Sequence, residues 1–287
     1  LVLVLGLIIL VISVLYSGQV VMPMKEVAGS IAMISSGDFN ETMQITGYSE
    51  AEDISDKFNS MLSVLQNLED ARQEFVSNVS HELKTPITSV KVLAESLIGQ
   101  ENVPVELYQE FMVDINEELE RMNKIINDLL TLVKMDKNAS EVNISEVNIN
   151  EFLEAILKQL QPIADKRNIE MIFESVRSVT AQVDEVKLAM AFRNLIENAI
   201  KYNYDNGWVR VSLNADHKFF YLKVSDSGVG IPEELQDSIF ERFYRVDKAR
   251  SRETGGTGLG LAIVKKIILM HHGTIKMHSE EDVGTTF

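Results

Sequence analysis

The strongest constraint on the fold is a heptad repeat of apolar positions in the first third of the chain. The repeat begins at Ile54 and ends at Phe75, with spacings that alternate between four and three residues. Such a stripe is buried only when a second helix packs along it, so the pattern predicts a coiled coil. The repeat comprises Ile54, Phe58, Met61, Leu65, Leu68, Arg72 and Phe75.

The stripe continues beyond Phe75 into a second predicted structure, a helical hairpin. Gly99 and Pro104 indicate its turn, and a returning helix runs to about Lys134. One hairpin buries too little apolar surface, whereas two hairpins form a four-helix bundle, so the pattern predicts a homodimer. The stripe contains Val79, Leu83, Val90, Leu93 and Leu97 in the first helix, and Phe111, Ile115, Leu119, Met122, Ile126, Leu129 and Val133 in the second.

His81 is a candidate reactive residue on the first of these helices. It lies two positions from both Val79 and Leu83, so at about 100° per residue it points away from the apolar stripe. A lone exposed histidine is ordinarily a solvated surface residue. Glu82 adjoins it, and Thr85 lies one turn further along the same face. Pro86 lacks an N–H group and is expected to bend the helix just after the histidine.

Composition excludes several classes of protein. A length of 287 residues predicts two or more domains. The absence of cysteine excludes disulfides and thiolate metal sites. A net charge of −16 argues against nucleic-acid binding, because contact with phosphates needs a basic surface.

The N-terminal segment 1–22 carries no charge and is expected to be a transmembrane helix. About twenty apolar residues are needed to span a bilayer as a helix, and this segment is just long enough. The alternative is the core of a signal peptide, but the segment lacks a basic leader. The first residue is Leu1 and the last is Phe287, so both ends look cut from a longer protein.

The C-terminal half has a mixed pattern that predicts an α/β sandwich. A polar stretch over 136–147 predicts a linker followed by an edge strand. We expect helices over 151–166 and 186–202, and strands over 169–176, 179–183, 208–213 and 219–226. Two further helical segments and two terminal strands follow.

Four patches in this half suggest a nucleotide site. Asn194, Asn198, Lys201 and Tyr202 share one helix face, although an ordinary amphipathic helix has the same pattern. The second patch is 226–231, Asp-Ser-Gly-Val-Gly-Ile, whose glycines a simple turn also explains. The third is 240–245, Phe-Glu-Arg-Phe-Tyr-Arg. The fourth, 255–260, runs glycine-rich backbone into a helix, where N–H groups can surround phosphate oxygens.

These motifs together resemble those of one family, the two-component sensor histidine kinases. The run 80–86, Ser-His-Glu-Leu-Lys-Thr-Pro, resembles their phosphoacceptor box. The four patches resemble, in order, the N, G1, F and G2 boxes of their GHKL-type ATPase domain. The segment 23–74 resembles a HAMP linker, although Ser55 stands where that module has glycine. A plain dimeric stalk is the alternative there.

The resemblance implies a multidomain α and α+β protein. Its expected parts are a transmembrane helix (1–22), a parallel coiled-coil HAMP linker (23–74) and a hairpin for dimerisation and histidine phosphotransfer (75–137). The last part is an α/β sandwich ATP-binding domain (142–287), truncated at its C-terminal end. The hairpins of two chains form the four-helix bundle.

The resemblance also implies roles for individual residues. His81 would accept the phosphoryl group of ATP, Glu82 would act as acid/base, and Thr85 would orient water for a phosphatase reaction. Asn198 would ligate Mg²⁺. The segment 245–254 would form a mobile lid, with Arg252 as a further candidate for phosphate contact. The implied ATP-binding residues are Asn194, Asn198, Lys201, Tyr202, Asp226, Gly228, Gly230, Ile231, Phe240, Arg245, Gly256, Thr257, Gly258, Leu259 and Gly260.

The expected cofactors and partners follow from the same resemblance. They are ATP and Mg²⁺, a second copy of the chain, the receiver domain of a response regulator, and the bacterial cell membrane, with residues after about 23 in the cytoplasm. No nucleic acid is expected. Two alternatives remain, a GHKL-type ATPase of the chaperone or mismatch-repair kind and a non-catalytic dimeric signalling scaffold. Transfer in cis or in trans within the dimer stays open.

Overall fold

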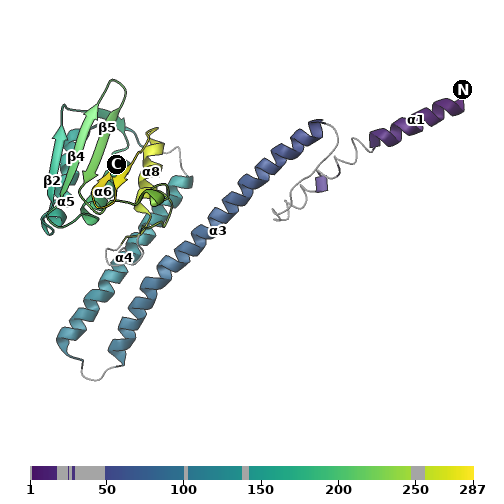
Figure 1. Ribbon diagram of the computed structural model, residues 1–287. Coiled ribbons are helices and arrows are strands. Elements are labelled where there is room, and N and C mark those ends of the chain that lie inside the picture. The colour runs from purple at the N-terminus through teal and green to yellow at the C-terminus, as the bar shows by residue number, and fades with distance from the viewer. Residues whose placement is uncertain are drawn as a thin grey trace. The chain divides into compact units, whose positions relative to one another are not determined.

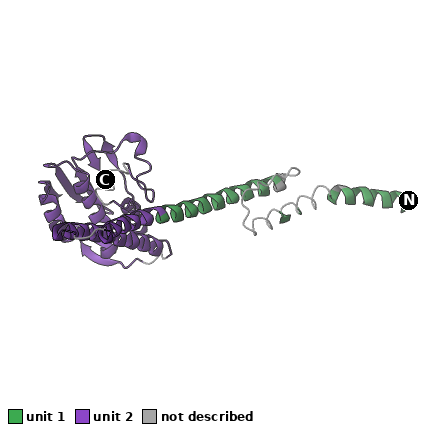
Figure 2. Cartoon of the chain, turned by 90° about the horizontal axis from the view of Figure 1, so that it is seen from below, with its two compact units in different colours: residues 1–80 green, residues 81–287 purple. Residues whose placement is uncertain are grey.

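The computed structural model describes residues 2–17, 25, 28–29, 49–99, 103–137, 142–246 and 256–287. The chain divides into two compact units, 1–80 and 81–287, which Figure 2 distinguishes by colour. The second unit contains His81 and all four patches, so the candidate chemistry lies within one unit.

The first unit begins with α1 (Val2–Tyr16), an apolar helix. No helix in the described ranges combines the length and the apolar character that crossing a bilayer requires. Residues 18–22 of the expected span lie outside the described residues. The same is true of the first helix and connector of the expected HAMP linker, apart from Lys25, Ala28 and Gly29.

A single long helix, α3 (Ser49–Ile98), carries both the heptad repeat and the phosphoacceptor box. It passes through the boundary expected between residues 74 and 75 without a break. Pro86 lies inside the helix and is buried, and the helix continues for three turns beyond it.

The hairpin returns through α4 (Val105–Lys137), which has two apolar faces. Ile125, Leu132 and Met135 are buried, although none of them belongs to the predicted stripe. Within that stripe, Leu119 is 45% and Val133 49% exposed. The prediction of one buried stripe is therefore incomplete, because α4 also packs against the C-terminal domain through helix α8 (Gly260–Met270).

The remaining chain forms an α/β domain, as predicted, with its helices and sheet in two layers (Figure 1). A two-stranded antiparallel sheet pairs β1 (Ser145–Asn148) with β3 (Thr180–Val183). A five-stranded sheet has the order β2-β4-β5-β7-β6, in which β2 and β4 are parallel and the other pairs antiparallel. Its strands are β2 (Glu170–Ser175), β4 (Trp208–Ala215), β5 (Phe220–Asp226), β6 (His278–Glu280) and β7 (Gly284–Thr286).

The helical layer consists of α5 (Ile149–Asp165), α6 (Glu185–Lys201) and α8, with the short 3₁₀ helix η2 (Glu233–Leu235) between β5 and α8. Polar residues define where the first two helices begin, because their side chains accept the otherwise unpaired amides of the first turn. Asn148 caps α5 and Asp184 caps α6. Alternate residues of β4 form the core, since Val209, Val211 and Leu213 are fully buried.

Candidate functional site

A cavity of about 410 Å³ lies in the second unit, where α6, the end of β5 and the N-terminus of α8 meet. Residues of all four patches line it, although the patches are dispersed over residues 194–260. A cavity of this size is typical of small-molecule sites. The predicted residues that line it are Asn194, Asn198, Lys201, Tyr202, Asp226, Gly230, Ile231, Arg245, Gly256, Thr257, Gly258 and Gly260.

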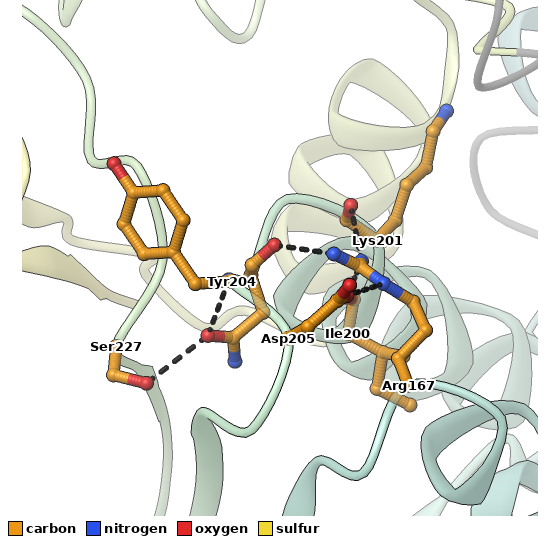
Figure 3. A network of polar contacts seen from close by, with 7 residues as sticks. Arg167, Ile200, Lys201, Tyr204, Asp205 and Ser227 are labelled. Atoms are coloured by element: carbon orange, nitrogen blue, oxygen red, sulfur yellow. Dashed lines mark hydrogen bonds and ion pairs between the residues drawn. The ribbon is translucent and has the colours of Figure 1, made fainter.

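The helix that carries the first patch is fixed at its C-terminal end by Arg167 (Figure 3). The Arg167 guanidinium donates to the carbonyl oxygens of Ile200 at 2.8 Å, Lys201 at 3.0 Å and Asn203 at 2.7 Å, and pairs with Asp205 at 2.8 Å. Ile200 and Lys201 belong to the last turn of α6, where a cation also complements the helix dipole. The network therefore holds the end of α6 in place beside the cavity.

Asp226 is presented to the cavity by the end of strand β5. Its Oδ1 accepts from the backbone amides of Gly228 at 2.9 Å and Thr285 at 3.2 Å. None of the described residues hydrogen-bonds its Oδ2. Burial raises the pKa of this carboxyl, and the two amides partly oppose that effect. One oxygen is thus fixed by the protein, and the other can accept a hydrogen bond from a ligand.

The start of α8 has the properties of an anion site. No side chain caps this helix, and Gly258, Gly260 and Leu261 at its start line the cavity. Amides of a first helical turn and the helix dipole both favour a phosphate. Gly258 has φ +70°, and a Cβ there would lie 2.8 Å from the Phe243 backbone, so only glycine fits closely against the third patch.

Three cations line the cavity together with four carboxylates, those of Glu197, Asp226, Glu281 and Asp282. Lys124, Lys201 and Arg245 all line it. Burial lowers the pKa of Lys201, and the charges of Lys124 and Arg245 lower it further, whereas Tyr202 opposes the shift. Positive charges that repel one another in a partly buried space are stabilised when an anion enters.

Three residues of the predicted ATP-binding set do not line the cavity. Leu259 is completely buried in the core, because it precedes the first turn of α8 and packs inward. Phe240 instead stacks edge-on against Phe287, with ring centroids 6.1 Å apart. Gly228 is needed for a different reason, since a Cβ there would collide with the carbonyl oxygen of Tyr202.

The structure also places residues in the site that the sequence patterns did not indicate. Lys124 comes from α4 of the hairpin, and no local motif marks it. A second unpredicted residue of α4, Asp128, accepts a hydrogen bond at 2.9 Å from the hydroxyl of Thr257, a buried residue of the predicted set. Burial raises the pKa of Asp128, against the opposing effects of Thr257 and Lys124. Residues 247–254 of the expected lid, including Arg252, lie outside the described residues.

The phosphoacceptor box forms a separate, exposed site on α3. His81 is exposed, as predicted, and lies at a shallow depression with Thr85 and Ser89. The Thr85 hydroxyl donates to the backbone carbonyl of His81 at 3.2 Å. Glu82 is half-buried and pairs with Arg245, with 2.7 Å between Oε2 and Nη2. This ion pair joins the two candidate sites.

The donor set at the cavity fits Mg²⁺ held mainly by phosphates. Within the described ranges, no three His, Cys, Asp or Glu side chains gather as metal ligands. The half-buried Asn198 amide lines the cavity, and an amide oxygen suits a hard cation. Asn194 is held by a hydrogen bond from its Nδ2 to the Met190 carbonyl at 2.9 Å.

Comparison with known proteins assigns the helical hairpin and the α/β domain. Residues 71–138 match the His Kinase A (phospho-acceptor) domain. Residues 183–287 match the histidine kinase-, DNA gyrase B- and HSP90-like ATPase family. Sensor protein kinase WalK of Staphylococcus epidermidis is 37% identical over 275 residues, which are 94% of this chain and 43% of that protein. The chain thus spans less than half of this relative.

The solved structures that resemble the chain include two that are 25% identical to it. Histidine kinase ThkA in complex with response regulator protein TrrA has a TM-score of 0.62 and covers 77% of this chain and 62% of that one. Full-length ShkA in complex with AMPPNP has a TM-score of 0.56 and covers 75% of this chain and 44% of that one.

Proposed function

We propose that this chain, which belongs to the sensor histidine kinase family, transfers the γ-phosphoryl group of ATP to His81 and then to an aspartate of a response regulator. The observation that carries the proposal is the convergence of four dispersed patches on one cavity, in the same unit as an exposed histidine. Family membership supports it, as do the AMPPNP complex of ShkA and the ThkA–TrrA complex.

Different residues of the cavity bind the base and the phosphates of ATP. The free oxygen of Asp226 accepts from the adenine amino group, which excludes guanine at that position. The α8 amides and the three cations hold the phosphates, while Asn198 holds Mg²⁺, which supplies charge neutralisation when bound. Glu82 draws the ring proton of His81 so that a neutral nitrogen attacks phosphorus.

Incubation of the protein with Mg²⁺ and γ-labelled ATP tests the proposal. A phosphohistidine is acid-labile, so the label on the protein is expected to survive alkali and to be lost in mild acid. A clamp ATPase would instead release phosphate without labelling itself, and a non-catalytic scaffold would do neither. Acid-stable labelling, or none, would contradict the proposal.

We propose a phosphatase role for Thr85, whose hydroxyl lies one turn from His81 and shares its depression. Thr85→Ala is expected to retain autophosphorylation within about twofold, because Thr85 is only half-buried and alanine has the higher helix propensity. Dephosphorylation of the phosphorylated regulator is expected to slow about tenfold or more, since an oriented water is lost. Equal loss of both activities would refute this division.

We propose that the protein is a homodimer through its hairpin. Large apolar side chains of α3 and α4 are exposed in a single chain, among them Val92 at 54% and Leu119 at 45%. Contiguous apolar faces of this kind are buried by a partner. Light scattering is expected to give twice the mass of one chain, and a monomer at micromolar concentration would contradict the proposal.

We further propose that the chain is anchored to the bacterial cell membrane, with residues after about 23 in the cytoplasm. The uncharged segment 1–22 supports the anchor, and the need for ATP supports the placement. Fractionation tests it, since the protein is expected to sediment with membranes and to be released when residues 1–22 are deleted.

A further inference from the structure

The ion pair between Arg245 and Glu82 joins the lining of the cavity to the neighbour of His81. Arg245 lines the cavity, whereas Glu82 does not. The Arg245 side chain is only 6% exposed and that of Glu82 21%, so the 2.7 Å contact between them is largely shielded from water. It follows that the guanidinium has almost no solvent to stabilise its charge.

A guanidinium in such a place needs an anionic partner. Leaving it unpaired and dehydrated costs far more than an exposed pair contributes. Arg245 can therefore leave Glu82 only if another anion replaces it. Its Nε–H is also buried and has no hydrogen-bond partner among the described residues, so one donor remains available for a ligand.

The remaining charges around the cavity show which anion fits. Lys124 and Lys201 line the same space as Arg245 and carry like charge. Lys124 has a carboxylate partner of its own, Glu197 at 3.9 Å, whereas none of the described carboxylates pairs with Lys201. A terminal phosphate carries more negative charge and offers three acceptor oxygens, so it can replace Glu82 and also meet the two lysines.

We infer that Glu82 and the terminal phosphate of a nucleoside triphosphate compete for Arg245, so that triphosphate binding releases the Glu82 carboxylate beside His81. Without nucleotide, Arg245 is a positioning residue that holds Glu82. With a triphosphate bound, the same guanidinium contacts phosphate, and the acid/base is set free when the phosphoryl donor is present. The inference rests on the proposed function and adds that Glu82 opposes triphosphate binding and leaves diphosphate binding unaffected.

The experiment measures dissociation constants for Mg²⁺-AMPPNP and for ADP by calorimetry on the full chain. Glu82→Ala removes the competing carboxylate, so the preference for AMPPNP over ADP is expected to rise about five- to twentyfold, in the range typical of coupling between sites. Glu82→Gln keeps a hydrogen-bond acceptor but no charge, and is expected to give an intermediate rise. Glu82→Gln also tests the inference if Glu82→Ala folds poorly because Arg245 is left unpaired.

Asp136→Ala is the matched control. Asp136 joins the same helical hairpin to the same domain, through Arg242 at 2.7 Å and Lys266 at 3.0 Å, and none of these three residues lines the cavity. Both ion pairs of Asp136 are partly exposed and contribute little to stability. The preference for AMPPNP over ADP is therefore expected to stay within about twofold of that of the unsubstituted chain.

The outcomes separate the inference from the proposed function. An unchanged preference in both Glu82 variants would overturn the competition, and so would an equal rise in Asp136→Ala, which would assign the effect to domain docking as a whole. If the unsubstituted chain bound neither nucleotide, the proposed function itself would fall.

Discussion

Replacing His81 by glutamine is expected to abolish acid-labile phosphorylation. The side chain is exposed on α3, outside the nucleotide cavity, and no other histidine lies beside Glu82 in the sequence. Glutamine has a high helix propensity and no nucleophilic ring nitrogen, so the substitution removes the chemistry and retains the helix. The label is read after incubation with Mg²⁺ and γ-labelled ATP.

Two controls make this result specific. AMPPNP affinity is expected to remain within about twofold, because exposed substitutions away from a site perturb the fold little. His217→Gln changes another exposed histidine, on the connection between β4 and β5, and is expected to label normally. If His81→Gln labelled as well as the unsubstituted chain, the phosphoacceptor assignment would be wrong.

Local patterns predicted the elements well because each has a local cause. The returning helix of the hairpin, the α/β domain and the exposure of His81 all follow from the spacing of apolar residues along the sequence. The glycine-rich run was correctly placed before a helix, since backbone without side chains and a following amphipathic stretch are visible in a sequence.

Features that depend on packing between distant segments were not predictable. Ile125, Leu132 and Met135 form a second apolar face on α4, which the heptad pattern of the bundle obscures. Lys124 reaches the cavity only because α4 lies against the ATPase-like domain. Patch membership also did not show that the Leu259 side chain is buried in the core, since a sequence motif does not distinguish residues that line a cavity from those that anchor the loop.

Asp226→Asn is expected to weaken ATP binding about ten- to hundredfold, the factor that corresponds to a lost hydrogen bond to a charged group. The amide oxygen of asparagine can still accept from Gly228 and Thr285, as Oδ1 does now. Its NH₂ group then faces the adenine amino group, so that two donors oppose each other. GTP, which offers a carbonyl acceptor at that position, is expected to bind no worse than before.

The fold is expected to tolerate this change. Because burial raises the folded-state pKa of Asp226, its contribution to stability is present at acidic pH and is lost as pH rises through that value. A neutral amide removes the cost of a buried charge, so the thermal midpoint at pH 7 should be unchanged or higher. A large fall would mean that the loss of binding reflects unfolding.

Asp216→Asn provides the matched control for Asp226→Asn. Asp216 also accepts from two backbone amides through Oδ1, those of Lys218 at 2.7 Å and Phe219 at 2.8 Å, but it does not line the cavity. ATP and GTP affinities are therefore expected to be unchanged in this variant. If Asp226→Asn left the ratio of ATP to GTP affinity unaltered, the carboxylate would not distinguish adenine from guanine. Adenine selection would then have to come from the shape of the cavity.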